Sequence, residues 1–173
     1  MQSALKSMTG KIILLNGRVQ SGKTSALMEL LKIPDPDIGG FLTPDRHGSR
    51  ILLNPENADV IPFQASTENP IADVISVGRF SFFTNSFDRA EKWTSDQQRK
   101  GLPLIIIDEI GKLELKDLGF HALITTLLSE QKNYQKYLFV IRDYLMDDII
   151  KKYNLEGASM ITLKELKNEL FSQ

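Results

Sequence analysis

Cysteine is absent from the 173 residues, and histidine occurs only twice. A chain without cysteine forms no disulfide framework and offers no thiolate as a metal ligand or as a nucleophile, which fits a reducing compartment. His47 and His121 lie far apart in the sequence, and neither has a partner at the spacing of metal ligands. We therefore expect neither histidine to bind a metal or to take part in catalysis.

An excess of charge of one sign is also absent. The 21 lysine and arginine residues nearly balance the 22 aspartate and glutamate residues, so the formal net charge is -1. This balance argues against a protein that binds nucleic acid through overall positive charge. At this length one domain is the simplest organisation, and we expect residues 1–173 to form a single domain.

Long hydrophobic runs are missing as well. The longest, IILL from Ile12 and LIII from Leu104, are far shorter than the roughly 18 residues of a membrane-spanning helix. The N-terminal sequence MQSALKSMTG lacks the apolar run of about 7 to 15 residues at the centre of a signal peptide. We therefore expect two buried strands, no membrane span and a location in the cytoplasm.

The order of the apolar segments predicts an α/β fold. A short apolar strand over residues 11–16 is followed by a glycine and then by apolar residues at helical spacing over 23–32. Further on, helices are expected over 86–100, 117–131, 144–153 and at the C-terminus, with strands over 104–107, 137–141 and 159–162. Such alternation is typical of a doubly wound, mostly parallel sheet with right-handed crossovers.

The stretch from Ile38 to Phe63 has a different pattern. Three short apolar segments, IGGFLT, RILLN and DVIPF, are separated by the turn-like sequences DRHGS and PENA. This pattern predicts a small antiparallel β meander inserted after the first helix. Residues 69–85 combine the alternation of ADVISV with the aromatic-rich GRFSFFTN, and the pattern leaves their structure open. The phenylalanines there are expected to fill a core rather than to stack on a base.

The segment GRVQSGKT fits the phosphate-binding pattern of a glycine, four residues, then glycine, lysine and serine or threonine. A predicted strand precedes it and a predicted helix follows it, as this motif requires. Its backbone N–H groups are expected to point at the β-phosphate, where the helix dipole adds favourable potential. Lys23 would bridge the β- and γ-phosphates, and Thr24 would bind Mg²⁺ through its hydroxyl. The nucleotide-binding residues predicted in this loop are Gly17, Arg18, Val19, Gln20, Ser21, Gly22, Lys23 and Thr24.

A second motif, LIIIDEIG, places two carboxylates at the end of an apolar strand. The carboxyl ends of parallel strands line the crevice in which open α/β sheets bind ligands. Asp108 is therefore predicted to contribute to nucleotide binding by holding Mg²⁺, and Glu109 is the candidate base that orients the water attacking the γ-phosphate. Asp108 alone would also suit a strand-end turn, and the phosphate-binding loop upstream favours the functional interpretation.

Three cationic residues are further candidates for contact with phosphate. Arg142 closes the apolar strand YLFVI, whose end should face the same crevice, so that it would stabilise charge on the γ-phosphate. A solvent-exposed pair between Arg142 and Asp143 is an equal alternative. Arg18 in the loop and Lys112 after the carboxylate pair are candidates of the same kind, although a surface position is favoured for both.

Four segments resemble those of a known family, namely GRVQSGKT, GGFLTPD, VGRF and above all DEIGKLEL. They follow the order found in the small P-loop nucleoside-triphosphatases first described in thermophiles, to which the human cancer-related nucleoside-triphosphatase is related. The resemblance runs from about Lys11 to the region of Glu130, and Phe120 is similar to the phenylalanine that follows the acidic segment in the family. It implies a RecA-like sheet, Mg²⁺-dependent hydrolysis of several nucleoside triphosphates to diphosphates, and slow turnover.

The sequence also departs from the family pattern. The segment RHGSRILLN keeps Arg46 and Arg50 but lacks the glycine–phenylalanine pair that follows in family members. VGRF has arginine and phenylalanine where the family has lysine and tyrosine, and the loop has Arg18, Gln20 and Ser25 where several members have more glycine or a second threonine. These departures leave the phosphate chemistry intact and bear on base preference and rate.

Three functions are compatible with these motifs. A nucleoside-triphosphate hydrolase, the favoured interpretation, depends on the carboxylate of Glu109 to activate water. A kinase-type phosphotransferase would instead move the γ-phosphate to a small acceptor. This alternative stays open because the loop alone does not distinguish the two outcomes. A nucleotide-gated switch would hydrolyse rarely and signal to an unknown protein partner, although the guanine-reading Asn-Lys-x-Asp motif is absent.

Overall fold

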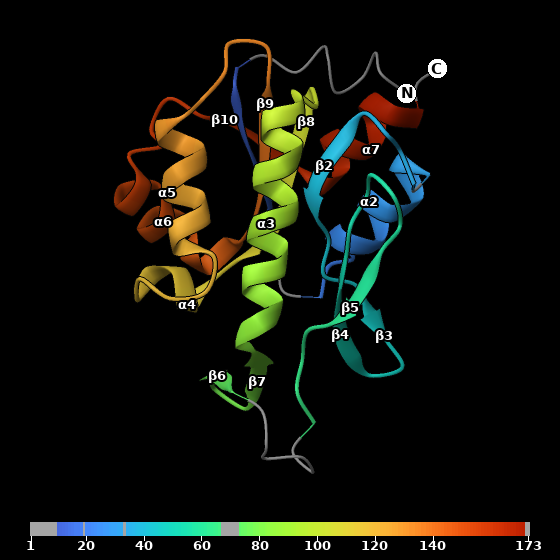
Figure 1. Cartoon of the computed structure of the whole chain (residues 1–173). Coiled ribbons are helices and arrows are strands. Elements are labelled where there is room, and N and C mark those ends of the chain that lie inside the picture. Colours follow the sequence, from blue (N-terminus) through green and yellow to red (C-terminus); the bar gives the residue numbers. More distant parts are fainter. Residues whose placement is uncertain (1–9, 19, 33, 67–72, 172–173) are drawn as a thin grey trace.

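Five parallel strands form the main sheet of the computed structural model, which describes residues 10–18, 20–32, 34–66 and 73–171. Their spatial order is β10-β1-β9-β8-β2 (Figure 1). The strands are β1 (Ile12–Gly17), β2 (Ile38–Phe41), β8 (Leu104–Ile110), β9 (Lys136–Arg142) and β10 (Ser159–Thr162). After β1 the chain crosses to the edge strand β2 and returns through β8 and β9, and β10 then pairs with the other side of β1. The predicted mostly parallel α/β sheet is confirmed.

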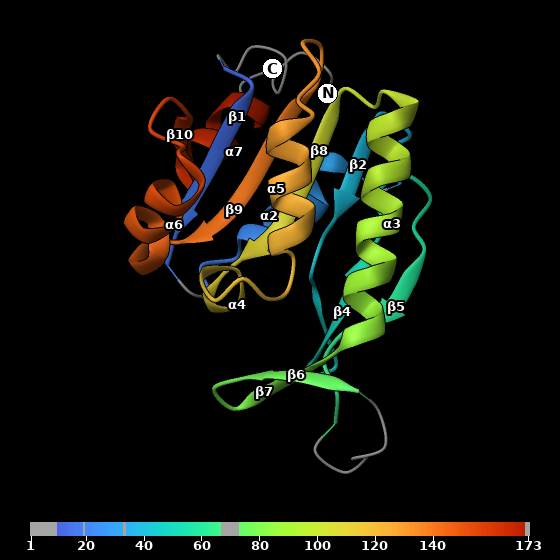
Figure 2. The ribbon, with the colours of Figure 1, turned by 60° about the vertical axis from the view of Figure 1, so that its left-hand side comes forward.

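Helices cover both faces of this sheet (Figure 2). One face packs against α2 (Lys23–Leu31) and α7 (Leu163–Phe171), and the other against α3 (Thr84–Lys100), α5 (His121–Ser129) and α6 (Met146–Tyr153). Ile106 belongs to the first core, whereas its neighbours Ile105 and Ile107 belong to the second. Because successive strand residues point to opposite faces and both faces are covered, the run LIII is apolar throughout.

The edge strand β2 corrects one expectation from the sequence. Residues Ile38–Phe41 were predicted as the first strand of an antiparallel meander, but they pair in parallel with β8 and all four are buried. Gly40 has a positive φ of 86°, and a Cβ there would lie 1.8 Å from the carbonyl oxygen of Ile106. Only glycine allows this close approach of two strands, so the glycine pair is what lets β2 join the sheet.

The antiparallel insertion therefore begins after β2. It consists of β3 (Asp45–Arg46), β4 (Ser49–Leu53) and β5 (Val60–Pro62), which pair antiparallel as predicted. The segment whose structure the sequence left open forms a hairpin of β6 (Val74–Val77) and β7 (Phe80–Phe83), and its first residues, 69–72, lie outside the described residues. Figure 2 shows this hairpin below the main sheet.

Three helices begin elsewhere than the sequence suggested. Helix α3 starts at Thr84, two residues before the predicted start at Ser86, and the hydroxyl of Ser86 donates to the carbonyl of Pro62 at 2.7 Å. The short helix α4 (Lys112–Leu115) comes after β8, and α5 starts after a reversal in which Asp117 and Gly119 have φ values of 60° and 64°. The expected helix over 144–153 opens with the 3₁₀ turn Asp143–Leu145 and continues as α6.

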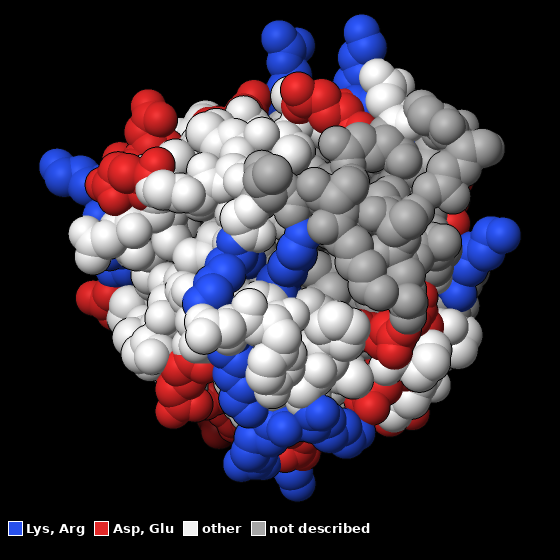
Figure 3. Space-filling model, turned by 90° about the horizontal axis from the view of Figure 1, so that it is seen from above, with Lys and Arg blue, Asp and Glu red and all other residues white. Residues whose placement is uncertain are grey.

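The surface carries charges of both signs. On the face shown in Figure 3, basic side chains run from the centre toward one edge, and acidic side chains lie on either side of them. This mixture agrees with the near-neutral net charge. None of the helices in the described part of the chain combines the length and the apolar character needed to cross a membrane.

Candidate active site

The register of the parallel strands brings the sequence motifs together. Strand β1 ends at Gly17, whose Cα partner on β9 is Arg142. Strand β8 lies on the other side of β9, with Asp108 opposite Val140, two residues before that arginine. The loop after β1 and the ends of β8 and β9 therefore meet at the carboxyl edge of the sheet, where open α/β sheets bind ligands.

The loop after β1 holds its lysine close to the backbone. Gly22 has a φ of 83°, a conformation that favours glycine, and leads into α2. The Nζ of Lys23 donates to the carbonyl oxygens of Gly17 at 2.6 Å and Arg18 at 2.8 Å. Burial lowers the pKa of Lys23 from its ordinary value, and the charge of Glu109 opposes this effect. The sequence thus positions one ammonium group within the loop.

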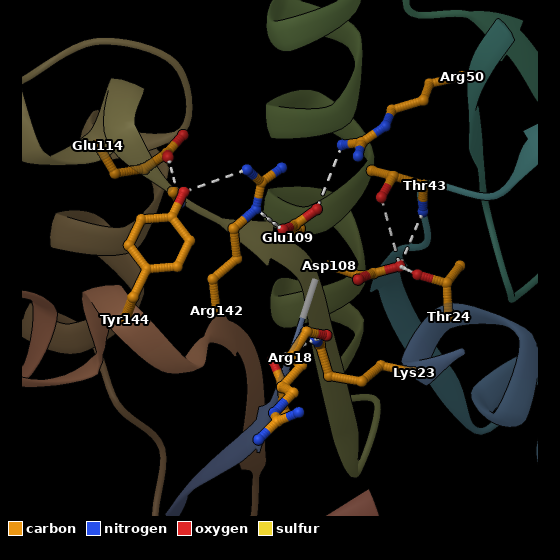
Figure 4. A network of polar contacts seen from close by, with 12 residues as sticks. Arg18, Lys23, Thr24, Thr43, Arg50, Asp108, Glu109, Glu114, Arg142 and Tyr144 are labelled. Carbon is orange, nitrogen blue, oxygen red and sulfur yellow. Dashed lines mark hydrogen bonds and ion pairs between the residues drawn. The ribbon is translucent and has the colours of Figure 1, made fainter. Parts of the chain in front are cut away.

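Asp108 is the buried acceptor at the centre of the site (Figure 4). Its Oδ2 accepts a hydrogen bond from the hydroxyl of Thr24 at 2.7 Å and another from the backbone N–H of Thr43 at 3.0 Å. Burial raises the pKa of Asp108 to about 6, and the hydrogen bonds from Thr43 and Thr24 oppose that rise. Two residues from separate elements, α2 and the chain after β2, therefore fix this carboxylate.

Glu109 lies between two arginines (Figure 4). The Nε of Arg142 donates to its Oε1, and Nη1 of Arg50 donates to its Oε2 at 3.2 Å. Burial alone would raise the pKa of Glu109, but the hydrogen bond and charge of Arg142, with the charges of Arg50 and Lys23, outweigh it and lower the pKa. Glu109 is consequently an ionised acceptor held in place at both oxygens.

A cavity of about 700 Å³ opens beside these groups. Its wall includes Lys23, Thr24, Asp108, Glu109 and Arg50. Its size falls in the range of about 300 to 1,000 Å³ that is typical of small-molecule sites. The loop and both predicted carboxylates thus face one space large enough for a nucleotide.

The donor groups in this cavity fit Mg²⁺. The hydroxyl of Thr24 and the carboxylate of Asp108 are oxygen ligands, which Mg²⁺ prefers. Over the residues that the structure describes, no three His, Cys, Asp or Glu side chains gather in a way that could hold a metal ion. Mg²⁺ is commonly held by one or two protein groups together with phosphate oxygens and water rather than in an all-protein cage.

The other predicted site residues divide into two groups. Arg142 faces Glu109 and not Asp143, so the alternative of a solvent-exposed pair with Asp143 is wrong. Arg18 is exposed and its side chain points away from Glu109 (Figure 4), and Lys112 lies over the ring of Tyr144, 5.9 Å from the centroid, outside the loop cavity. Both therefore match the surface interpretation. Val19 lies outside the described residues.

Two residues of the site were not predicted as site residues. Thr43 and Arg50 contact Asp108 and Glu109 from the chain that follows β2 and from β4. The sequence offers two signals for them: Thr43 lies in GGFLTPD, one of the four segments that carry the family resemblance, and Arg50 is one of the two arginines that RHGSRILLN keeps. Nothing in their local spacing points to the carboxylates.

Comparison with known proteins decides the family. A family model described as NTPase matches residues 12–173. The chain belongs to this family. A relative named Nucleoside-triphosphatase THEP1, from Methanocaldococcus jannaschii, is 26% identical over 128 residues, which cover 69% of this chain and 73% of that protein. The resemblance drawn from the four sequence segments is thereby confirmed.

Solved structures agree with the fold. The crystal structure of THEP1 from the hyperthermophile Aquifex aeolicus matches with a TM-score of 0.65 and 21% identity, over 88% of this chain and 89% of that one. The solution structure of a human cancer-related nucleoside triphosphatase matches with a TM-score of 0.62 and 20% identity, over 92% and 94% of the two chains. The P-loop NTPase fold expected from the resemblance is confirmed.

Proposed function

We propose that this protein hydrolyses nucleoside triphosphates to diphosphates and phosphate, with Mg²⁺ and with little selection among bases. The observation that carries the proposal is the hydrogen bond between Thr24 and Asp108 in the same cavity as the fixed carboxylate of Glu109. Membership of the NTPase family and the name of the archaeal relative support hydrolysis as the reaction.

The loop and its neighbours have separate roles in this proposal. The backbone of Gly17–Thr24 and the ammonium of Lys23 bind the β- and γ-phosphates. Thr24 and Asp108 hold Mg²⁺, which when bound neutralises charge on the phosphate oxygens. Arg142 lies at the end of β9 beside Glu109, where its charge stabilises the γ-phosphate as the bond breaks.

Glu109 positions the attacking water. An ionised carboxylate accepts a hydrogen bond from water, and the two arginines keep it in one orientation. Its lowered pKa makes it a weak base. Phosphoryl transfer has a loose transition state in which positioning and charge matter more than proton abstraction. The arrangement therefore supports hydrolysis at the slow rate that the family resemblance implies.

The lining of the loop cavity supports broad base specificity. It consists mostly of loop, hydroxyl and charged residues, and Met28 and Pro44 are the apolar side chains among the described residues there. Such a wall is better suited to bind phosphates and metal than to select one base tightly.

We propose further that residues 1–173 act as one domain in the cytoplasm. Nucleic acid is not a partner in this proposal, and an unidentified protein is a possible one.

Phosphate release tests this proposal. ATP, GTP, CTP and UTP are incubated in parallel with Mg²⁺ or with EDTA, with the wild type, with Glu109→Gln, and with Glu91→Gln as the control at an exposed glutamate of α3. We expect Mg²⁺-dependent release from all four, a loss of at least about a hundredfold in Glu109→Gln, and retained nucleotide binding in that variant. Unchanged turnover in Glu109→Gln would overturn the assignment, and tight binding without turnover in the wild type would favour a switch.

A further inference from the structure

A second cavity, of about 190 Å³, adjoins the loop cavity at Glu109. Thr43, Arg50 and Glu109 line both cavities. A ligand in the second cavity would therefore meet the nucleotide at the carboxylate that faces the γ-phosphate in the proposed mechanism. Hydrolysis needs room for one water, which takes about 30 Å³. The second cavity is several times larger than the proposed reaction requires.

Aromatic rings form much of its wall. Phe63, Phe82, Phe87 and Phe120 are buried, with ring centroids 4.5 Å apart for Phe63 and Phe82 and 4.7 Å apart for Phe87 and Phe120. Phe80 of the β6–β7 hairpin is half-buried and also lines the cavity. An apolar cavity of about 150 Å³ holds one benzene molecule. This one thus has room for a single aromatic ring with one or two substituents.

In the described part of the chain, two of the basic residues around the cavity have no carboxylate partner. Arg79 and Lys112 line it, are exposed, and form no ion pair within the described residues. The guanidinium of Arg79 lies 5.0 Å from the centroid of the Phe80 ring. Cations that are not neutralised attract an anionic group to a cavity whose wall is in large part aromatic.

The acidic residues of the cavity are already engaged. Glu109 pairs with Arg50 and Arg142. The carboxylate of Glu114 accepts hydrogen bonds from the backbone N–H groups of Gly111 at 2.7 Å and Phe120 at 3.0 Å. The balance of available charge in this cavity is therefore positive.

We propose that the second cavity binds a one-ring aromatic molecule that carries an anionic group and a hydroxyl, and that this hydroxyl accepts the γ-phosphate in place of water. The proposal rests on the nucleotide site assigned above and adds a phosphotransferase activity to it. The bond from the γ-phosphorus to the β–γ bridging oxygen breaks, and a bond from that phosphorus to the acceptor oxygen forms. The acceptor proton is released to solvent, and the products are a nucleoside diphosphate and a phosphate monoester.

Three small probes test the ligand chemistry. The first, 4-(hydroxymethyl)benzoate, carries the ring, the carboxylate and the hydroxyl; benzyl alcohol lacks the carboxylate, and trans-4-(hydroxymethyl)cyclohexanecarboxylate lacks the aromatic ring. Binding is measured by calorimetry with Mg²⁺ and ADP present, and phosphate monoester formation from ATP by ³¹P NMR. We expect the first probe to bind at least about tenfold more tightly than the other two, and to yield the monoester.

Substitutions in the wall of the second cavity test whether the first probe binds there. Arg79→Ala and Phe80→Ala are each expected to weaken binding of the first probe by at least about tenfold. Arg89→Ala is the matched control, because Arg89 also lies over an aromatic ring, 5.8 Å from the centroid of Trp93, but on α3 and outside the cavity. No saturable binding of any probe up to about 10 mM, or equal binding in all variants, would overturn the proposal.

Two further outcomes separate transfer from hydrolysis. Binding of the first probe without formation of the monoester would overturn the transfer step. Phosphate release from ATP is measured in the same samples without probe: release there combined with no probe binding would leave the hydrolase assignment intact and overturn only this inference. Monoester formation with no release in the absence of probe would support the acceptor site and overturn the hydrolase assignment.

Discussion

Arg142 and Glu109 lie near the carboxyl ends of neighbouring parallel strands, and the Nε of the arginine donates to the Oε1 of the carboxylate. The side chains are 22% and 17% exposed, so water screens this ion pair only in part. The pair lowers the pKa of Glu109 against the effect of burial and restricts its rotation. A residue that was predicted to touch phosphate therefore also positions the candidate catalytic carboxylate.

Removal of Arg142 should impair turnover more than binding. We expect Arg142→Ala to lower kcat for ATP by at least about tenfold, because both the orientation of Glu109 and a charge near the γ-phosphate are lost. KM should change less, because the loop residues that bind phosphate are intact. Steady-state kinetics on this variant and on Arg89→Ala, which alters an arginine away from the site, provide the check. A kcat within twofold of the wild type would contradict the role given to Arg142.

Thr24 and Thr43 allow a matched test of the Mg²⁺ site. Both contact the same oxygen of Asp108, Thr24 through its hydroxyl at 2.7 Å, and Thr43 through its backbone N–H at 3.0 Å with only a weak hydroxyl contact at 3.4 Å. Valine removes a hydroxyl but keeps the backbone N–H. We expect Thr24→Val to raise the Mg²⁺ concentration for half-maximal phosphate release by more than about tenfold, and Thr43→Val to change it much less.

A Mg²⁺ titration of phosphate release distinguishes the two variants. Equal shifts in both would mean that the Thr24 hydroxyl only supports Asp108, as Thr43 does, and is not a ligand. Circular dichroism of each variant verifies that the sheet is retained, because Asp108 is buried and depends on both residues for its hydrogen bonds.

The two motifs of the site could be identified from the sequence because the residues of each are close together in the chain. The glycines and Lys23 of the loop act within eight consecutive residues, and Asp108 and Glu109 are adjacent. Arg50 and Glu109 are 59 residues apart, and the contact from Thr43 to Asp108 uses a backbone N–H, which every residue except proline possesses. Such contacts depend on tertiary packing, and no local spacing encodes them.

Strand β2 shows that prediction of the fold from local sequence has the same limit. Two of its four residues are glycines, Gly39 and Gly40, so the strand lacks the continuous run of large apolar residues that is typical of a strand covered on both faces. The turn-rich sequence that follows then favoured a meander. The helix expected over 117–131 is present as α5 but starts later than predicted, for a different reason: Asp117 and Gly119 both have positive φ and reverse the chain before α5. Aspartate is less common than glycine in that conformation, so the turn signal was weak.

Gly40 should be essential for stability. Its φ of 86° disfavours a side chain, and a Cβ would lie 1.8 Å from the carbonyl oxygen of Ile106 on β8. We expect Gly40→Ala to lower the free energy of unfolding by more than about 3 kcal/mol, because β2 must move away from β8. Gly157→Ala is the control, since a Cβ there meets no atom within 4 Å, and it should change stability by less than about 1 kcal/mol. Urea unfolding of both variants measures the difference, and similar values would contradict the close approach of the two strands.

Glu114 should make stability depend on pH. Burial raises its pKa above the ordinary value of 4.5, and the hydrogen bonds from the N–H groups of Phe120 and Gly111 oppose that rise. The folded chain then binds more protons than the unfolded chain between the two pKa values. The contribution of this carboxyl to the free energy of unfolding is therefore complete below 4.5 and is lost as pH rises through the folded pKa.

Urea unfolding of the wild type and of Glu114→Gln at a series of pH values tests this sign. Because the glutamine amide does not titrate, the difference between the two free energies isolates the carboxyl of Glu114, apart from a constant cost for the changed hydrogen bonds. We expect the wild type to lose stability relative to the variant over the pH interval that begins at the ordinary pKa of 4.5 and ends above the raised pKa of the folded chain. A relative gain over that interval would mean that the folded chain holds Glu114 as a carboxylate, with the two N–H groups outweighing burial.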